Sequence, residues 1–388
     1  MKKKLLISMI TAFLFAYAPG FSQQYNDANI DSLIKEQVQS QVAGNSKFML
    51  TGYGSSGIQF TNSESSFGAS VSPIFLWKPD KRILFAAELE TGLEGTETMI
   101  ELEYGYASIF LNKYITVRAG KFLSPFGIYQ ERLHPQWINK LPSIPLGFNH
   151  DEAPVGPPSE IGVDVRGGAQ LGSAKINYSL YLSNGPALLT TSSDMSSGAG
   201  QLMYASAEDN NKNKTIGGRI GLLPFSNSSF EIGGSFQNGI VGDKESEYEN
   251  VKARQYALDF EYVKNLDFLK GLFDVKAQWN WVNVDNANYI NPEDSMSYTF
   301  NNKRDAGFVQ AAYRPSMSQS KFLKKTELVF RYSGLNVPDL TDGKESKMKT
   351  TQYTYGINYW YSWRTVLKLA YQSQKDNNAF YIRVAVGF

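Results

Sequence analysis

The sequence contains no cysteine, so the protein can have neither a disulfide framework nor a thiolate-liganded metal site. Its 38 basic and 37 acidic residues give a formal net charge of +1, which provides no bulk attraction to nucleic acid. It has two histidines, His134 and His150, and both lie in one irregular segment. Beyond residue 22, no apolar run approaches the roughly 20 residues that a membrane-spanning helix needs. Spanning helices and cysteine chemistry are therefore excluded for that part of the chain.

Aromatic residues are abundant, with 23 Tyr and 24 Phe, and glycine is frequent, with 33 residues. Many of the aromatic residues occur in runs of about ten residues in which apolar and polar positions alternate. Successive side chains of a strand point to opposite faces, so each run gives one apolar face and one polar face. In the run from Ile100, the apolar face is expected to include Leu102, Tyr104, Tyr106 and Phe110. The strong runs are 67–77, 83–90, 100–110, 273–281 and 352–361.

Eleven weaker runs join these five strong ones, which makes sixteen in total, and bacterial single-chain barrels have even strand numbers. The connections also tend to alternate between short and long, as in an up-and-down barrel. The sequence therefore predicts an all-β fold, a transmembrane antiparallel β-barrel of about 16 strands over residues 47–388. The weaker runs are 47–60, 114–120, 161–171, 174–183, 214–223, 229–237, 254–263, 304–314, 326–334, 364–373 and 379–388.

A soluble β-sandwich or propeller would also show alternation, with an aliphatic inner face and a charged outer face. Here the apolar face is rich in Tyr, Phe and Trp, whereas the other face carries Gly, Ser, Gln and similar numbers of acids and bases. This distribution favours a water-filled lumen and a lipid-facing exterior over a dry core.

The N-terminal region is expected to direct export. Residues 1–22 have a basic start, Met1-Lys2-Lys3-Lys4, then a short apolar stretch and small residues before Gln23, which is typical of a cleaved signal peptide. Residues 23–46 are expected to form a periplasmic segment with a short amphipathic helix. That helix could self-associate at the foot of a trimer, or it could pack under the barrel or remain mobile.

The last run, 379–388, places Phe380, Ile382, Val384 and Phe388 on one face. A closed barrel needs its final strand to pair with the first, because no edge can remain exposed in lipid. The terminal aromatic residue resembles the C-terminal signature of Gram-negative outer-membrane barrels, which the barrel assembly machinery reads. The resemblance implies localisation in the outer membrane.

The longest connection, residues 121–160, is rich in proline, aromatic and turn residues. Long connections of this kind are commonly functional, and its position suits a loop that bends into the lumen and narrows it. The candidate constriction residues are Lys121, Glu131, Arg132 and Lys140.

The start of this connection, Gly120-Lys121-Phe122 followed by Pro125-Phe126-Gly127, resembles the phosphate-selective porin O/P family. The opening strand Leu50-Thr51-Gly52-Tyr53-Gly54 and Phe388 also fit. The resemblance implies a sixteen-stranded homotrimeric porin whose long third loop forms the constriction. A few members concentrate arginine and lysine there to hold phosphate.

This sequence differs from those phosphate-specialised members. Strand alternation points nearly equal numbers of acids and bases into the lumen, which gives no net anion trap. The principal pore-lining candidates are Arg82, Glu88, Glu101, Glu103, Arg118, Arg166, Arg219, Asp274, Lys276, Arg331 and Arg383. The same alternation adds Glu90, Asp164, Lys175, Glu231, Asp259, Glu261, Glu327 and Lys368.

Other chemistry has weaker support. The G-x-G-x-x-G pattern at 52–57 lies on a predicted strand with no helix after it, unlike a dinucleotide site. His134 and His150 lack an evident nucleophile and orienting group, and the Asp/Asn clusters at 209–211 and 285–288 fit turns better than a calcium loop. We therefore expect no catalytic residue, cofactor or metal.

The sequence predicts an outer-membrane porin for passive diffusion of small hydrophilic solutes and ions, with anions such as phosphate among the candidates. Its expected partners are outer-membrane lipid, two further copies of the chain in a homotrimer, and the assembly machinery, but no nucleic acid. The alternative is a structural or binding barrel of an envelope complex, with a lumen plugged by the long loop. A barrel hydrolase is a third possibility that the sequence does not support.

Overall fold

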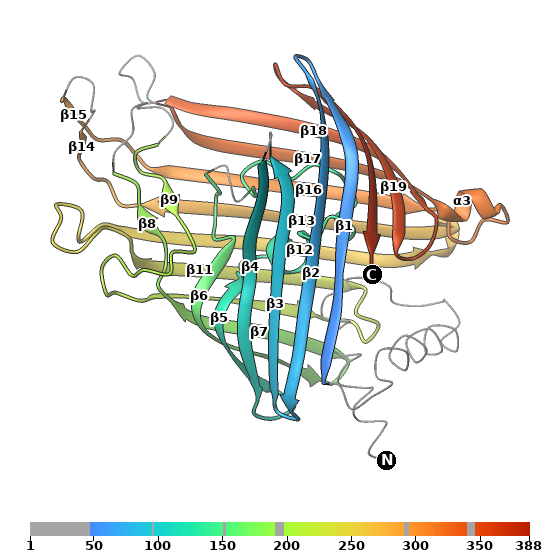
Figure 1. Cartoon of the computed structure of the whole chain (residues 1–388), viewed down its shortest axis with the longest axis horizontal. Helices are drawn as coiled ribbons and strands as arrows, with labels where there is room; N and C mark the ends of the chain where they lie inside the picture. The colour runs from blue at the N-terminus through green and yellow to red at the C-terminus, as the bar shows by residue number, and fades with distance from the viewer. Residues whose placement is uncertain (1–46, 95–96, 150–152, 191–197, 291–294, 340–345) are drawn as a thin grey trace.

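The computed structural model describes residues 47–94, 97–149, 153–190, 198–290, 295–339 and 346–388. Within these residues, sixteen strands form one closed antiparallel barrel (Figure 1). The first barrel strand, β1 (Phe48–Thr61), pairs with the last, β20 (Ala379–Gly387), and closes it. The expected signal peptide and the segment 23–46 lie outside the described residues.

Each predicted run overlaps one barrel strand, so the predicted fold class and strand number are confirmed. The other fourteen strands are β2 (Ser65–Asp80), β3 (Ile83–Glu94), β4 (Glu97–Phe110), β5 (Ile115–Leu123), β6 (Ser159–Leu171), β7 (Ala174–Ser183), β10 (Thr215–Leu223), β11 (Phe230–Ile240), β12 (Lys252–Leu266), β13 (Gly271–Val284), β16 (Lys303–Arg314), β17 (Thr326–Asp339), β18 (Ser346–Trp360) and β19 (Thr365–Gln374).

Shorter elements occur in the connections. Two hairpins pair β8 (Ala187–Leu188) with β9 (Leu202–Met203) and β14 (Tyr289–Ile290) with β15 (Ser297–Tyr298). The helical turns are η1 (Tyr129–Leu133), η2 (Asp267–Leu269) and α3 (Lys321–Lys325). None of the described helices has the length and apolar character needed to cross a membrane.

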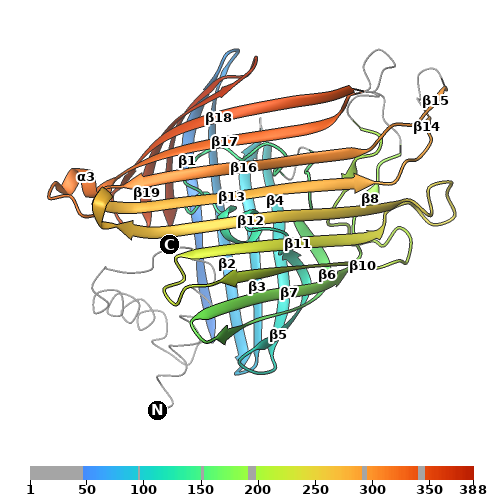
Figure 2. The same cartoon turned by 180° about the vertical axis from the view of Figure 1, so that it is seen from behind.

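The strands of opposite walls cross steeply. In Figure 1, β1–β4 run across β12–β18, as expected for strands that are tilted to the axis of a barrel. Figure 2 shows the same barrel from behind, with α3 and the C-terminus at one end and the hairpin β14–β15 at the other. The connections after β7 and β11 approach the end with the hairpin, and the turns after β10 and β12 lie at the opposite end.

The outer face is apolar, as the last strand demonstrates. Phe380, Ile382 and Val384 are exposed, whereas their neighbours Tyr381 and Ala385 are buried inside the barrel. The chain continues to pair beyond β20, because the Phe388 amide donates to the Gly52 carbonyl at 2.9 Å and the Gly52 amide donates back at 3.1 Å. The predicted orientation of this strand is therefore confirmed.

The predicted face of β4 is wrong for part of its length. A β-bulge lies at Glu103, because Leu89 pairs with Leu102 and Glu88 pairs with Tyr104. Ile100 and Leu102 face outward, as predicted, but Tyr104 and Tyr106 are each only 3% exposed and lie inside the barrel. The extra residue of a bulge shifts the alternation by one position, and the sequence pattern contains no sign of it.

Candidate functional site: the barrel lumen and its inner loop

The connection between β5 and β6, residues 124–158, enters the barrel; we call it the inner loop. Its entry depends on Gly127, which has φ +71° and lies against β13. A Cβ at this position would lie 2.1 Å from the side chain of Gln278, so only glycine fits without displacement. The Oε1 atom of Gln278 then accepts hydrogen bonds from the amides of Ile128 at 2.7 Å and Tyr129 at 2.8 Å. The Pro125-Phe126-Gly127 motif thus brings the loop backbone onto the wall.

The inner loop has an apolar anchor of its own. Tyr129 and Phe148 stack edge to face with ring centroids 5.1 Å apart, and both contact Phe308 of β16, at 5.7 and 5.3 Å. Ile128 and Val155 complete this buried cluster, which continues into the connections that carry β8, β9 and β14. Burial of apolar side chains from several connections stabilises the loop inside the barrel.

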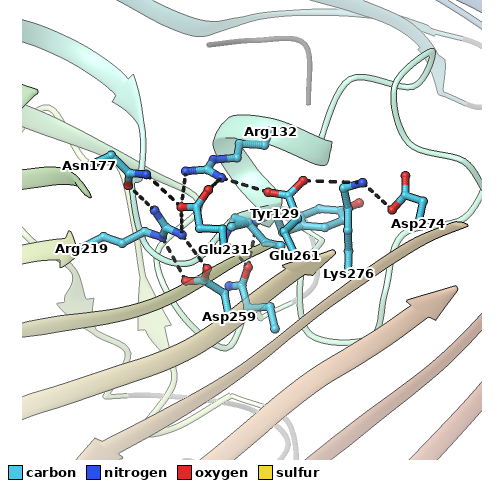
Figure 3. Close-up of polar contacts among 11 residues, drawn as sticks. Tyr129, Arg132, Asn177, Arg219, Glu231, Asp259, Glu261, Asp274 and Lys276 are labelled. Carbon is cyan, nitrogen blue, oxygen red and sulfur yellow. Dashed lines mark hydrogen bonds and ion pairs between the residues drawn. The ribbon is translucent and has the colours of Figure 1, made fainter. Parts of the chain in front are cut away.

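Arg132 connects the loop to an acidic part of the wall. Its Nη1 atom lies 2.8 Å from Glu231 of β11 and 3.0 Å from Glu261 of β12. Arg219 of β10 lies beside the same group, with Nη2 2.9 Å from Glu231 and 2.5 Å from Asp259. Figure 3 shows the two guanidiniums on either side of Glu231. Each charge is thereby compensated, which buried ions require.

Glu131, the preceding loop residue, is an acid that faces two basic residues of the wall. Its carboxylate lies 2.6 Å from Arg166 of β6 and 3.1 Å from Arg118 of β5, and Arg118 also pairs with Asp164 at 2.7 Å. Burial would raise the pKa of Glu131, but the Arg166 and Arg118 guanidiniums outweigh it and lower this pKa to about 2. The carboxylate therefore stays ionised at neutral pH and holds the loop against β5 and β6.

Lys140 makes a third ionic contact further along the loop. Its ammonium group pairs with Glu327 of β17 and lies 3.3 Å from Asp274 of β13, which also binds Lys276 at 2.6 Å. Burial would lower the pKa of Lys140, but the two carboxylates prevail and raise it. Lys140 therefore remains a cation.

Basic wall residues also bind backbone carbonyls of the loop. Arg331 donates to the Ser143 carbonyl at 2.8 Å and to its hydroxyl at 2.7 Å, and Lys368 donates to the Gln136 and Asn139 carbonyls. Arg383 donates to the side-chain oxygen of Gln136 at 2.8 Å. These contacts extend the attachment of the loop to β17, β19 and β20.

Most predicted pore-lining residues lie inside the barrel. Buried among them are Glu88, Glu103, Arg118, Arg219, Asp274, Lys276 and Arg331. Arg166 and Arg383 are half-buried and contact the inner loop, and Glu101 is exposed on β4 near the bulge. Of the predicted loop residues, Glu131, Arg132 and Lys140 all contact the wall.

Two predicted site residues lie elsewhere. Arg82 is exposed in the turn between β2 and β3, because those strands extend to Asp80 and from Ile83. Lys121 is part of β5, where its neighbour Phe122 points inward and its own ammonium group donates to the Leu102 carbonyl at 2.7 Å. Lys121 is therefore on the opposite face to the lumen.

Sequence reasoning missed several neutral residues that hold the loop, among them Gln136, Ser143 and Gln278. Their partners lie more than 80 residues away in the chain, and Gln and Ser are common on every polar strand face. Alternation placed Gln278 on the inner face, but no local pattern marks it as a loop contact.

The chain is similar to known proteins in its fold and not in its sequence. No protein-family model matches the chain, and no curated protein is significantly similar in sequence. A solved structure of OmpF from Salmonella typhi in complex with daunomycin is similar, with a TM-score of 0.56 and 11% identity, over 88% of this chain and 98% of that one.

Two structures of OmpT from Vibrio cholerae, a loop L8 deletion mutant and an in-vitro folded trimer form, are also similar. Each has a TM-score of 0.51 and 11% identity, over 88% of this chain and 99% of that one. This chain therefore has the sixteen-stranded barrel fold of these outer-membrane proteins.

Proposed function

We propose that the protein is an outer-membrane porin through which small hydrophilic solutes and ions diffuse passively. The observation that carries this proposal is a closed barrel with an apolar, aromatic outer face and a charged interior. Lipid requires closure, since no unpaired strand edge can be exposed to hydrocarbon. Charged side chains inside the barrel keep water there, so a polar solute crosses without losing its hydration.

The inner loop would set the size limit of the channel. Arg132 and Lys140 face carboxylates of one part of the wall, and Glu131 faces guanidiniums of another. These contacts fix the loop across the lumen instead of leaving it in the external medium. The solute path would then pass half-buried wall residues beside the loop, which include Arg166 and Glu90.

Weak ion selectivity follows from the pairing of the charges. Arg118, Arg219 and Lys276 each lie within 3 Å of a carboxylate, so they do not form an uncompensated basic cluster. Selectivity filters for anions use rings of basic side chains. We therefore propose a general diffusion porin and no phosphate specialisation. A reversal potential in asymmetric salt that shows strong anion preference, or block of chloride current by phosphate, would contradict this.

We also propose how the chain is exported and assembled in the membrane. Residues 1–22 would direct export, the strand that leads to Phe388 would be read by the assembly machinery, and outer-membrane lipid would surround the barrel. Association as a homotrimer is part of the same proposal. No catalytic role is proposed. Chemical crosslinking of the detergent-solubilised protein, followed by mass determination, tests the trimer.

Liposome swelling tests the diffusion function. Vesicles that contain the purified protein should swell in isotonic sugar at a rate that falls as the sugar becomes larger. Vesicles that contain heat-unfolded protein are the control. Equal swelling for all sugars, or none in vesicles with folded protein, would contradict the proposal.

A second candidate function is a barrel whose inner loop closes the lumen, with a structural or binding role in the envelope. The favouring observation is the wide distribution of loop contacts: Gln136 bonds Ser55 of β1 and Arg383 of β20, Lys140 pairs with Glu327 of β17, and Arg132 pairs with Glu231 of β11. A closed barrel would admit no sugar, so its vesicles would not swell, yet the protein would run as a folded barrel on gels.

A further inference from the structure

Three potential metal ligands converge where the inner loop meets β3 and β4. His134 follows η1, and its amide donates to the Tyr129 carbonyl at 2.9 Å. Its Nε2 atom lies 3.7 Å from Oε2 of Glu90 on β3, and its Nδ1 atom lies 3.6 Å from Oε1 of Glu103 on β4. One ligand atom from each of the three residues lies within 4.8 Å of the other two.

Glu103 points inward, as alternation predicted, and lies at the β4 bulge. Tyr104, the next residue, also points inward, so two successive side chains of β4 enter the barrel. A bulge commonly re-aims a side chain in this way. Glu88 is also buried here, where it accepts a hydrogen bond from the Tyr53 hydroxyl at 2.6 Å.

The imidazole of His134 lies between Glu90 and Glu103. An imidazole is a good metal ligand, and it adds a nitrogen to the two carboxylates of the cluster.

We propose that Glu90, Glu103 and His134 bind a divalent transition-metal ion such as Zn²⁺. Zinc is commonly held by imidazole nitrogen and carboxylate oxygen at about 2.0–2.2 Å, with water in the remaining position. Two ligands at that distance around a tetrahedral ion are roughly 3.4 Å apart. The three ligand atoms lie within 4.8 Å of one another, so they must move closer together, and His134 would bind through one of its two ring nitrogens. The ion would offset the repulsion between carboxylates and link the loop to the β3–β4 wall. This site goes beyond the proposed diffusion function and does not depend on it.

Calorimetric titration with Zn²⁺ tests the site. The full mature chain is purified in detergent without a polyhistidine tag, which would itself bind zinc, and is freed of metal with EDTA. We expect a single Zn²⁺ to bind per chain near neutral pH. His134→Ala and Glu103→Gln should each weaken this binding by about tenfold or more, since loss of outer-shell groups alone has effects of that order.

Matched controls separate this site from others. His150→Ala removes the other histidine of the sequence, and Glu97→Gln neutralises an exposed acid at the far end of β4; both should retain wild-type affinity. Heat-modifiable gel mobility checks that each variant forms a barrel. Absence of Zn²⁺ binding by the wild type, or wild-type affinity in folded His134→Ala and Glu103→Gln, would overturn the proposal.

A measurement on the wild type alone gives a second test that does not depend on the folding of variants. X-ray absorption at the zinc edge should show one imidazole and oxygen ligands at about 2.0–2.2 Å. A coordination shell without imidazole would refute the assignment.

Discussion

Several charged side chains inside the barrel form ion pairs that join the inner loop to the wall. Arg132 binds Glu231 and Glu261, whereas Glu131, one residue earlier, binds Arg118 and Arg166. A buried ion without a partner is costly, so each contact depends on the residue opposite. Alternation predicted which wall residues face the lumen, but it could not predict which loop residue meets each of them.

Loss of Arg132 should be strongly destabilising. Arg132→Met keeps much of the side-chain length but leaves Glu231 and Glu261 without their shared cation, and removing one partner of a buried pair costs about 3–5 kcal/mol. The free energy of unfolding, measured by urea titration in lipid vesicles, should fall by about that amount. Arg219, which remains bound to Glu231, would reduce the loss toward the lower value.

The matched control is Arg254→Met, which breaks the exposed pair with Asp285 at 2.7 Å. Exposed ion pairs contribute about 0–1 kcal/mol, so this change should be nearly neutral. Equal effects of the two substitutions would mean that Arg132 does not anchor a buried loop.

Val384 tests the orientation of the last strand. Its side chain is 40% exposed on the outer face, so Val384→Arg would place a charge in hydrocarbon and should cost about 2–4 kcal/mol near the membrane midplane. The yield of folded barrel on gels and the free energy of unfolding measure this. Arg383→Ala, one residue away on the inner face, should preserve barrel assembly; an equal assembly defect would contradict the orientation.

At the scale of elements, the inner loop depends on close backbone approach. Gly127 and Gly172 both have positive φ, at +71° and +63°. Of the two, only at Gly127 would an added Cβ collide with a neighbouring side chain. Gly127→Ala should therefore combine backbone strain with displacement from Gln278, and limited proteolysis should cut the loop faster. Gly172→Ala carries the strain alone and should leave proteolysis of the loop unchanged. Similar cleavage rates in both variants would contradict the close contact.

The strands were predictable as elements because each one is amphipathic by itself. Alternation in 353–361 or 379–388 needs no knowledge of neighbours, since one face meets a polar lumen and the other an apolar exterior. The bulge at Glu103 was not predicted, because Tyr104 and Tyr106 are aromatic residues of the kind expected on the outer face. Only their packing against Phe122 and Tyr181 inside the barrel decides their orientation.

At the scale of the whole molecule, closure and strand number followed from the sequence, whereas the filling of the lumen did not. β1 is expected to pair with β20, because an unpaired strand edge would otherwise be exposed. The contacts of Gln136 with Ser55 and Arg383 join distant parts of the chain through side chains with no periodic pattern. The position of the inner loop therefore had to come from the structure.

The central claim is a water-filled path that passes an anchored inner loop, and single-channel recording in planar bilayers tests it most directly. The wild type should give ohmic current steps, and Arg132→Met, in which the loop loses an anchor, should give larger or noisier steps than Arg254→Met. Bilayers that stay electrically silent, although gels show inserted and folded barrel, would contradict the account.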